Sequence, residues 1–295
     1  MSSPAIEVLE LCKSYGAHEA VRGITFSVGR GEIFGLLGPN GAGKTTTVEI
    51  LEGYRERTSG EVRVLGADPG RRPRALRERV GIVLQTSGMY RFLTVREALT
   101  HWAGLYPHAR DVEETIVLAG LQEKAGARVR TLSGGQARRL DLALALVGDP
   151  ELIFLDEPTT GFDPAARRTA WDTVRSLRAL GKTVLLTTHY LDEAQELCDR
   201  VGIVKDGRIL AVGRPRELGV GSTRARVSWR DEHGEPQVRE VDDPTALLHE
   251  LTGAALARGT VVAELSVARP SLEDVYLALT ADAVEAAPAE EVARV

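Results

Sequence analysis

The sequence predicts an α/β fold with a parallel core sheet, an antiparallel β patch beside it, and a helical insertion. Three observations predict this fold. The chain opens with strands that alternate apolar and charged residues, such as residues 6–11. Short apolar runs then alternate with helical segments, a pattern typical of parallel sheets. A glycine-rich loop at residues 38–45 stands between one apolar run, residues 33–37, and a helix at residues 46–51.

The elements before residue 136 have local causes in the sequence. Apolar residues bounded by glycine or charged turns predict strands at residues 6–11, 24–28, 33–37, 61–65 and 80–84. Thr94 and Glu97 form a capping box that opens a helix, and residues 111–119 have the pattern of a second helix. Residues 86–135 are therefore predicted to form a helical insertion into the core.

The core pattern resumes after the insertion. Leu132–Gln136 opens a helix, and a longer helix is predicted to begin at Pro164, with Asp163 as its N-cap, and to end at Gly181. The dipeptide Asp206-Gly207 between two apolar runs predicts a hairpin. The remaining core strands are expected at residues 152–157, 183–187, 201–205 and 208–212.

A second, smaller domain is expected after the core domain at residues 5–215. Over residues 216–281 the sequence predicts a small α+β accessory domain. Its strands are expected at residues 223–229, 236–240 and 260–267, and its helices at residues 245–251 and from residue 270. Residues 282–295 are mostly Ala, Glu and Val, and we expect this tail to be disordered.

The loop at residues 38–45 matches the phosphate-loop pattern G-x-x-x-x-G-K-[ST]. A strand, a glycine-rich turn and a helix N-terminus place backbone N–H groups around an anion. Lys44 is expected to neutralise the β- and γ-phosphates, and the Thr45 hydroxyl to bind Mg²⁺. The residues expected to bind the nucleotide here are Gly38, Pro39, Asn40, Gly41, Ala42, Gly43, Lys44, Thr45 and Thr46.

Two carboxylates follow the apolar run at residues 152–155. We expect Asp156 to hold Mg²⁺ at the carboxyl edge of the sheet, where α/β sheets bind ligands. Glu157 can polarise a water against the γ-phosphate. His189 stands at the end of another core strand and is a candidate for contact with the γ-phosphate.

Two motifs have more than one interpretation from the residues alone. Tyr15 is either an ordinary surface aromatic or a residue that stacks on a purine base. Ser133, Gly134 and Gly135 form either a helix cap or a second anion site.

Composition excludes several classes of function. The net charge of −5 and a pI near 5.8 argue against a dedicated nucleic-acid binder. No apolar run approaches the roughly 18 residues of a membrane span, and the N-terminus has no signal-peptide pattern. We therefore expect a cytoplasmic protein whose membrane role, if it has one, depends on a partner.

The order of the motifs resembles that of an ATP-binding cassette (ABC) subunit, over residues 5–215. These motifs are Gly38–Thr45, Gln85, Leu132–Gln136, Leu152–Glu157, Gly161–Asp163 and His189. Residues 84–90, 158–164 and 271–276 are similar to a narrower group, the ATPases of ABC-2-type exporters of the daunorubicin-resistance kind.

The resemblance implies roles for single residues. Tyr15 would stack on adenine, and Gln85 would touch Mg²⁺ and the attacking water. Glu157 would be the catalytic base and His189 the switch residue on the γ-phosphate. The residues that would close on ATP held by a second copy of the chain are Ser133, Gly134, Gly135 and Gln136, with Asp163 crossing the interface.

The resemblance also implies partners. The chain would hydrolyse ATP as a head-to-tail dimer and drive a separate ABC-2-type permease from the inner face of the cell membrane. The exported compound would be drug-like or lipophilic, and residues 85–96 would be the docking surface. No nucleic-acid partner is expected.

The alternative is a soluble ABC mechanoenzyme that acts on nucleic acid or ribosomes. DNA-repair members carry long heptad coiled coils, and ribosome-associated members carry two cassettes; neither pattern occurs in this sequence. An inactive nucleotide sensor is disfavoured because Glu157 and His189 are both present.

Overall fold

The computed structural model describes residues 3–83, 91–218, 225–231, 233–268, 272–274 and 276–277. The chain divides into two compact units, Met1–Gly213 and Arg214–Val295, and each is described by itself. Gln85, the segment at residues 86–90 and the tail at 282–295 lie outside the described residues.

The first unit begins with a three-stranded antiparallel sheet of order β2-β1-β4. Its strands are β1 (Ile6–Tyr15), β2 (His18–Val28) and β4 (Ser59–Val64). Both longer strands extend beyond the predicted ranges because they continue into the hairpin that pairs Tyr15 with His18. The predicted antiparallel patch is confirmed.

The core sheet has six strands in the order β5-β6-β7-β3-β8-β9, all parallel except the last pair. Its strands are β3 (Ile33–Leu37), β5 (Val80–Val83), β6 (Leu152–Asp156), β7 (Thr183–Thr188), β8 (Arg200–Lys205) and β9 (Arg208–Gly213). Asp206 and Gly207 both have positive φ, 49° and 75°, which is the geometry that the predicted hairpin requires.

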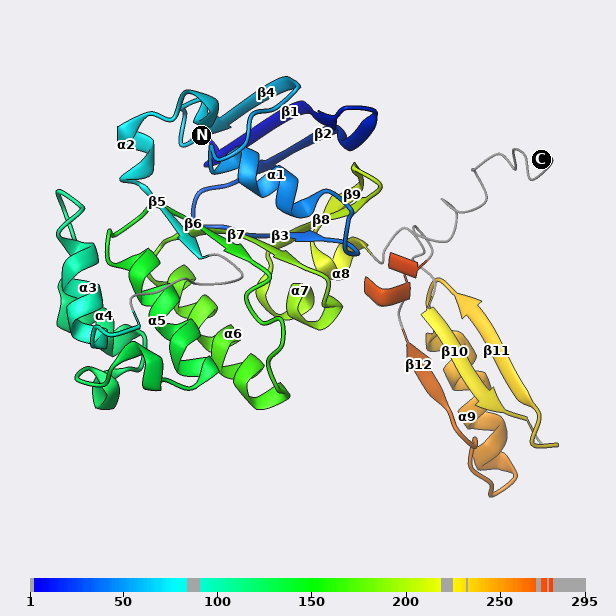
Figure 1. Ribbon diagram of the computed structural model, residues 1–295. Coiled ribbons are helices and arrows are strands. Elements are labelled where there is room, and N and C mark those ends of the chain that lie inside the picture. Colours follow the sequence, from blue (N-terminus) through cyan, green and yellow to red (C-terminus); the bar gives the residue numbers. More distant parts are fainter. Residues whose placement is uncertain are drawn as a thin grey trace, which may run out of the picture. The chain divides into compact units, whose positions relative to one another are not determined.

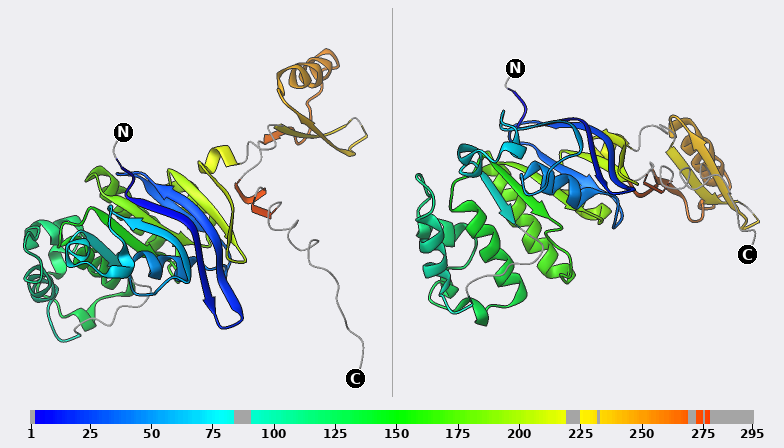
Figure 2. Two further views of the ribbon diagram at one scale, coloured as in Figure 1. Left: turned by 90° about the horizontal axis from the view of Figure 1, so that it is seen from above. Right: turned by 45° about the horizontal axis from the view of Figure 1, so that its top comes forward.

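Helix α1 (Lys44–Leu51) lies between the two sheets, and the antiparallel sheet covers it (Figures 1 and 2). Val48, Ile50 and Leu51 belong to one buried cluster with Phe34 of β3 and Phe154 of β6. Helices α6 (Pro164–Ala179) and α7 (Leu191–Leu197) lie on the opposite face of the core sheet (Figure 1). This packing holds the carboxyl ends of β3, β6 and β7 in fixed positions.

A helical layer with its own hydrophobic core follows β5 in the chain. It consists of α3 (Val95–Ala103), α4 (Val112–Leu118) and α5 (Gly134–Leu146). The capping box of Thr94 and Glu97 is present, and Ser133 and Gln136 form a second one at the start of α5. The shorter helices of the first unit are α2 (Arg74–Arg77) and the 3-10 turns η1 (Pro69–Arg71), η2 (Gln122–Lys124) and η3 (Val129–Thr131).

The second unit contains a three-stranded antiparallel sheet of order β11-β10-β12, a short helix and a longer one. Its elements are α8 (Pro215–Leu218), β10 (Ala225–Arg230), β11 (Pro236–Val241), α9 (Thr245–Ala257) and β12 (Ser266–Ala268). The predicted strand at residues 260–267 is wrong over most of its length. Residues 260–265 form no ladder, because a turn at 263–264 puts Glu264 at φ 53°.

None of the helices in the described part of the chain has both the length and the apolar composition of a membrane span.

Candidate nucleotide site at the carboxyl edge of the core sheet

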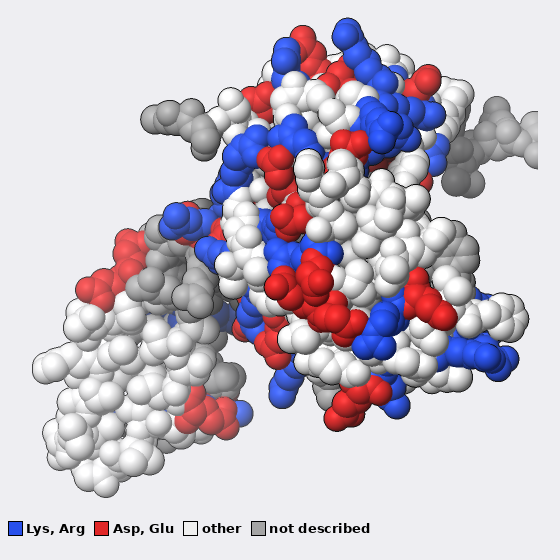
Figure 3. Space-filling view, turned by 90° about the vertical axis from the view of Figure 1, so that its left-hand side faces the viewer, with Lys and Arg blue, Asp and Glu red and all other residues white. Residues whose placement is uncertain are grey.

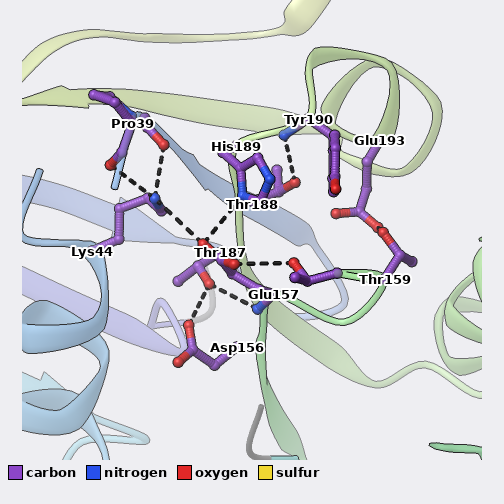
Figure 4. A network of polar contacts seen from close by, with 12 residues as sticks. Pro39, Lys44, Asp156, Glu157, Thr159, Thr187, Thr188, His189, Tyr190 and Glu193 are labelled. Carbon is purple, nitrogen blue, oxygen red and sulfur yellow. Dashed lines mark hydrogen bonds and ion pairs between the residues drawn. The ribbon is translucent and has the colours of Figure 1, made fainter. Parts of the chain in front are cut away.

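Three neighbouring parallel strands, β6, β7 and β3, end at the same edge of the core sheet. The phosphate loop follows β3, Asp156 and Glu157 stand at the end of β6, and His189 follows β7. The register pairs Leu37 with Thr188 and Asp156 with Thr187, so these segments meet at one level. Figure 4 shows their side chains converging.

The loop at residues 38–45 owes its shape to its glycines. Gly41 and Gly43 have φ of 82° and 96°, which side-chain-bearing residues rarely adopt. A Cβ on Gly38 would lie 2.2 Å from the Val204 carbonyl oxygen, and one on Gly43 would lie 2.5 Å from that of Ala20. The loop is therefore a tight backbone turn that other residue types could not form.

Helix α1 begins directly after this turn. Its N-cap, Gly43, has no side chain with which to bond the first N–H groups of the helix. The first N–H groups of a helix have no intrahelical acceptor, and they carry the positive end of the helix dipole. Thr45 is exposed at this end, whereas Lys44 is buried. The turn and the helix end thus have the properties of an anion-binding site.

Lys44 lies in the middle of the site with only 4% of its surface exposed. Its ammonium donates to the carbonyl oxygens of Gly38, at 2.7 Å, and Pro39, at 3.1 Å. It lies 3.7 Å from Oε1 of Glu157. Burial lowers the pKa of Lys44, an effect that the charges of Glu157 and Asp156 oppose. Lys44 is the cation of the site that can neutralise a phosphate bound in this loop, whereas the two carboxylates beside it repel anions.

Asp156 and Glu157 are joined through Thr187 of β7. The Thr187 hydroxyl donates to Oδ1 of Asp156 at 2.5 Å and accepts from the Glu157 backbone N–H at 3.0 Å. Sequence reasoning missed Thr187. The only signal in the sequence is a threonine near the end of a core strand. That this strand lies next to the one carrying the two acids becomes visible only once the strand order is known.

Glu157 is the acid that faces the other charged groups. Its Oε1 lies 3.3 Å from Nδ1 of His189, and its Oε2 accepts from the Thr160 hydroxyl at 3.0 Å. Burial opposes ionisation, but the bonds with Thr160 and His189 and the charges of His189 and Lys44 outweigh it, and the pKa of Glu157 is lowered. A deprotonated carboxylate is the form that a general base requires.

Other sequence-predicted site residues lie elsewhere in the fold. Tyr15 ends β1 with 40% exposure, and Lys13 Nζ and the Arg55 guanidinium lie 5.0 and 5.3 Å from its ring centroid. Ser133 stands at the start of α5, where its described bonds close the capping box with Gln136. Asp163 accepts from the Ala166 N–H at the start of α6.

Comparisons with known proteins agree with this geometry. The family model described as ABC transporter matches residues 21–160. The Nod factor export ATP-binding protein I of Rhizobium meliloti (strain 1021) is 40% identical over 94% of this chain and 88% of its own. The protein of the same name from Burkholderia pseudomallei (strain 1710b) is 42% identical over 95% of this chain and 98% of its own.

Solved structures give the same result. The ATP-binding subunit of an ABC transporter has a TM-score of 0.65 and 29% identity, over 72% of this chain and 91% of its own. A Clostridium perfringens protein that is part of an ABC transporter complex has a TM-score of 0.65 and 27% identity, over 74% of this chain and 91% of its own. The fold prediction is confirmed. This chain is an ATPase and belongs to the family of ATP-binding subunits of ABC transporters.

Proposed function

We propose that this chain is the ATP-hydrolysing subunit of an exporter: it pairs head-to-tail with a second copy on ATP and drives a separate ABC-2-type permease. One observation carries the proposal. At the carboxyl edge of the core sheet, Lys44 Nζ and His189 Nδ1 both lie within 4 Å of Oε1 of Glu157. The relatives' names, which specify Nod factor export, support the direction of transport. The exported compound is proposed to be lipophilic or drug-like.

In this proposal the phosphate loop binds the triphosphate. The backbone N–H groups of residues 38–46 surround it, and Lys44 exchanges its bonds to loop carbonyls for bonds to phosphate oxygens. Tyr15 stacks on the adenine: its ring is 40% exposed at the end of β1, although the base would share the ring with the cations of Lys13 and Arg55.

The donor set at this edge fits Mg²⁺. The Thr45 hydroxyl and the Asp156 carboxylate are hard oxygen donors, and the bond from Thr187 orients Asp156. No cluster of three or more His, Cys, Asp or Glu suited to a metal occurs among the residues that the structure describes. Mg²⁺ usually binds through one or two carboxylates together with substrate phosphates, which agrees with this set. Bound there, it would neutralise charge on the phosphates; Gln85 is proposed as a further contact.

Glu157 is proposed as the general base for the attacking water, and His189 as the residue that contacts the γ-phosphate. The short distance between Glu157 and His189 and the lowered pKa of Glu157 support these roles. Gln85 is proposed to orient the same water.

The second half of each ATP site is proposed to come from a partner copy. Among the described hydrogen bonds of Ser133, none reaches the loop at residues 38–45, because this residue caps a helix of a different layer. Ser133, Gly134, Gly135 and Gln136 therefore offer an exposed helix N-terminus to the partner's ATP, and Asp163 lies at the interface.

The permease is proposed to dock on residues 85–96. Within the described part of this surface, Phe92 is 75% exposed and the Arg130 guanidinium lies 5.7 Å from its ring centroid. An exposed aromatic with an arginine over it is typical of residues that anchor interfaces. Through this contact the chain would lie on the inner face of the membrane. Figure 3 shows acidic and basic side chains intermixed on one face, which does not favour a nucleic-acid partner.

Membrane recruitment tests the proposal. The chain is expressed with and without a candidate ABC-2-type permease from the same genome, and ATPase activity is measured in the soluble and membrane fractions. We expect partner-dependent sedimentation with membranes and partner-stimulated hydrolysis. A chain that stays soluble and hydrolyses ATP at the same rate with and without the partner would contradict the exporter and favour the mechanoenzyme.

A further inference from the structure

Glu193 is a buried acid outside the proposed nucleotide-binding set. It lies in the first turn of α7 (Leu191–Leu197), four residues after His189, and only 1% of its surface is exposed. A buried carboxyl group is costly unless it is hydrogen-bonded, and in the described part of the chain the partners of Glu193 bond Oε1, whereas Oε2 is buried without one.

Two side chains from different segments donate to the same oxygen of Glu193. The Thr159 hydroxyl donates to Oε1 at 2.8 Å, and Nε1–H of Trp171 donates to it at 3.1 Å. Thr159 lies two residues after Glu157, whereas Trp171 belongs to α6. Thr159 is fully buried and Trp171 is 9% exposed. One buried oxygen therefore joins the turn after Glu157 to α6 and α7, as Figure 4 shows for Thr159.

The segment that carries His189 is attached to the same helix. The Tyr190 N–H donates to the Thr188 hydroxyl at 3.0 Å, and the Ala194 N–H donates to the Tyr190 carbonyl at 3.2 Å. The Tyr190 ring lies 4.1 Å from the His189 ring and 4.2 Å from the Arg167 guanidinium, centroid to centre. A shift of α7 relative to the turn at Thr159 would therefore move His189 relative to Glu157.

We propose that Glu193 is a positioning residue that locks the His189 segment to the turn after Glu157, so that Glu157 keeps its contacts with both His189 and Lys44. Burial raises the pKa of Glu193, although the bonds from Thr188, Thr159 and Trp171 oppose this effect. What the lock needs from residue 193 is an oxygen acceptor at Oε1. Glutamine supplies that acceptor in a side chain of nearly the same shape, whereas alanine leaves two buried donors without one.

The inference rests on the proposed roles of Glu157 and His189, so its test measures both. The full-length chain is compared with Glu193→Ala, Glu193→Gln and Thr159→Val for kcat, KM for ATP, binding of a non-hydrolysable ATP analogue and melting temperature. Glu196→Ala is the matched control, because Glu196 is on the same helix but 56% exposed in a surface pair with Arg175. Glu157→Gln is assayed in parallel.

We expect Glu193→Ala and Thr159→Val to lower kcat about tenfold, with KM and analogue binding within about twofold of the parent. Glu193→Gln should recover most of kcat, and Glu196→Ala should match the parent. A purely stabilising role would lower the melting temperature and leave kcat per folded molecule unchanged, and that result would overturn the proposal. A Glu193→Gln variant as slow as Glu193→Ala would also overturn it.

Three further outcomes complete the test, and the last two separate this inference from the proposed function. If Glu193→Ala does not fold, Thr159→Val decides, because it removes one bond to Oε1 and keeps the side-chain volume; an unchanged kcat in that variant would refute the lock. If Glu157→Gln retains full turnover, the proposed base is wrong whatever the other variants do. If Glu157→Gln is inactive while Glu193→Ala and Thr159→Val are unaffected, only the role of Glu193 fails.

Discussion

The two ends of β6 carry acids in opposite situations. Glu151, just before the strand, bonds Arg30 and Arg79 with side chains that are all about two-fifths exposed. Those bonds, from Arg79 above all, lower the pKa of Glu151 to about 2. Glu157, just after the strand, has a side chain that is 13% exposed and lies beside Lys44 and His189.

This difference shows how one strand can serve both stability and chemistry. At its first end, arginines bond the carboxylate directly at 2.5–3.0 Å, so the charges there are satisfied and near water. At its last end, the cation stands 3.7 Å away and is bonded to loop carbonyls instead. Charges that are held near one another without being fully paired can respond to a ligand. We therefore expect substitutions at the first end to change stability and substitutions at the last end to change turnover.

The largest expected effect is that of Glu157→Gln. This variant keeps the shape of the side chain and removes the proposed base, so we expect kcat to fall about 100-fold or more. ATP binding should be unchanged, and the variant should accumulate as an ATP-bound dimer, visible by size-exclusion chromatography with ATP. Melting temperature should change little. Full turnover in this variant would remove Glu157 from the base role and break the contrast between the two ends.

Most of the fold was accessible from the sequence because local patterns determine it. Apolar runs bounded by glycines predicted the core strands, and Thr94 and Glu97 marked the start of α3. The strand predicted at residues 260–267 was wrong because its apolar pattern could not reveal the turn at Glu264. Alternation of apolar residues indicates which side chains are buried. It does not indicate where the segment pairs with β10 and where it turns instead.

The site was accessible where a motif carries its chemistry within a few residues. The loop at residues 38–45 and the pair Asp156 and Glu157 are of this kind, and the structure brings them together. Thr187 and Glu193 are not, because their importance comes from strand order and from helix packing. A threonine in a strand and a glutamate in a helix are ordinary in sequence, so only the three-dimensional contacts distinguish them.

A second prediction tests whether the ATP site at the carboxyl end of β6 is complete within one chain. Ser133→Arg places a bulky cation at the exposed N-terminus of α5, away from the bonds of the phosphate loop. If a partner's ATP binds there, hydrolysis should fall at least about tenfold, whereas ATP binding to the monomer stays the same. Binding is measured by equilibrium dialysis and hydrolysis by phosphate release. Hydrolysis at the parent rate would refute the shared site.

Glu151→Gln addresses the first end of β6. The side chains of Glu151, Arg30 and Arg79 are all more than a third exposed, so solvent screens the two ion pairs. We therefore expect a loss of only about 1 kcal/mol in unfolding free energy at pH 7. The pKa of Glu151 is depressed in the folded state, so this stabilisation is present above the ordinary pKa of 4.5 and is lost as the pH falls toward about 2. Urea unfolding of both proteins at several pH values measures the difference. A kcat changed along with stability would contradict the separation of the two ends.

Asp149→Asn gives the smallest expected effect and the most controlled test of the first end. Asp149 accepts from Lys182 at 2.8 Å and from Arg110 at 3.1 Å, and its side chain is 47% exposed. Its φ of 50° lies in the left-handed region, which asparagine tolerates about as well as aspartate. The substitution therefore removes the charge without backbone strain, and we expect a loss of about 0.5 kcal/mol in unfolding free energy.

Asp149→Ala is the matched control. It removes the charge and also adds the cost of a left-handed backbone at alanine, so it should lose about 1 kcal/mol more. Equal losses in the two variants would mean that the backbone at residue 149 relaxes; a loss of kcat in either would mean that the two edges of the sheet are coupled.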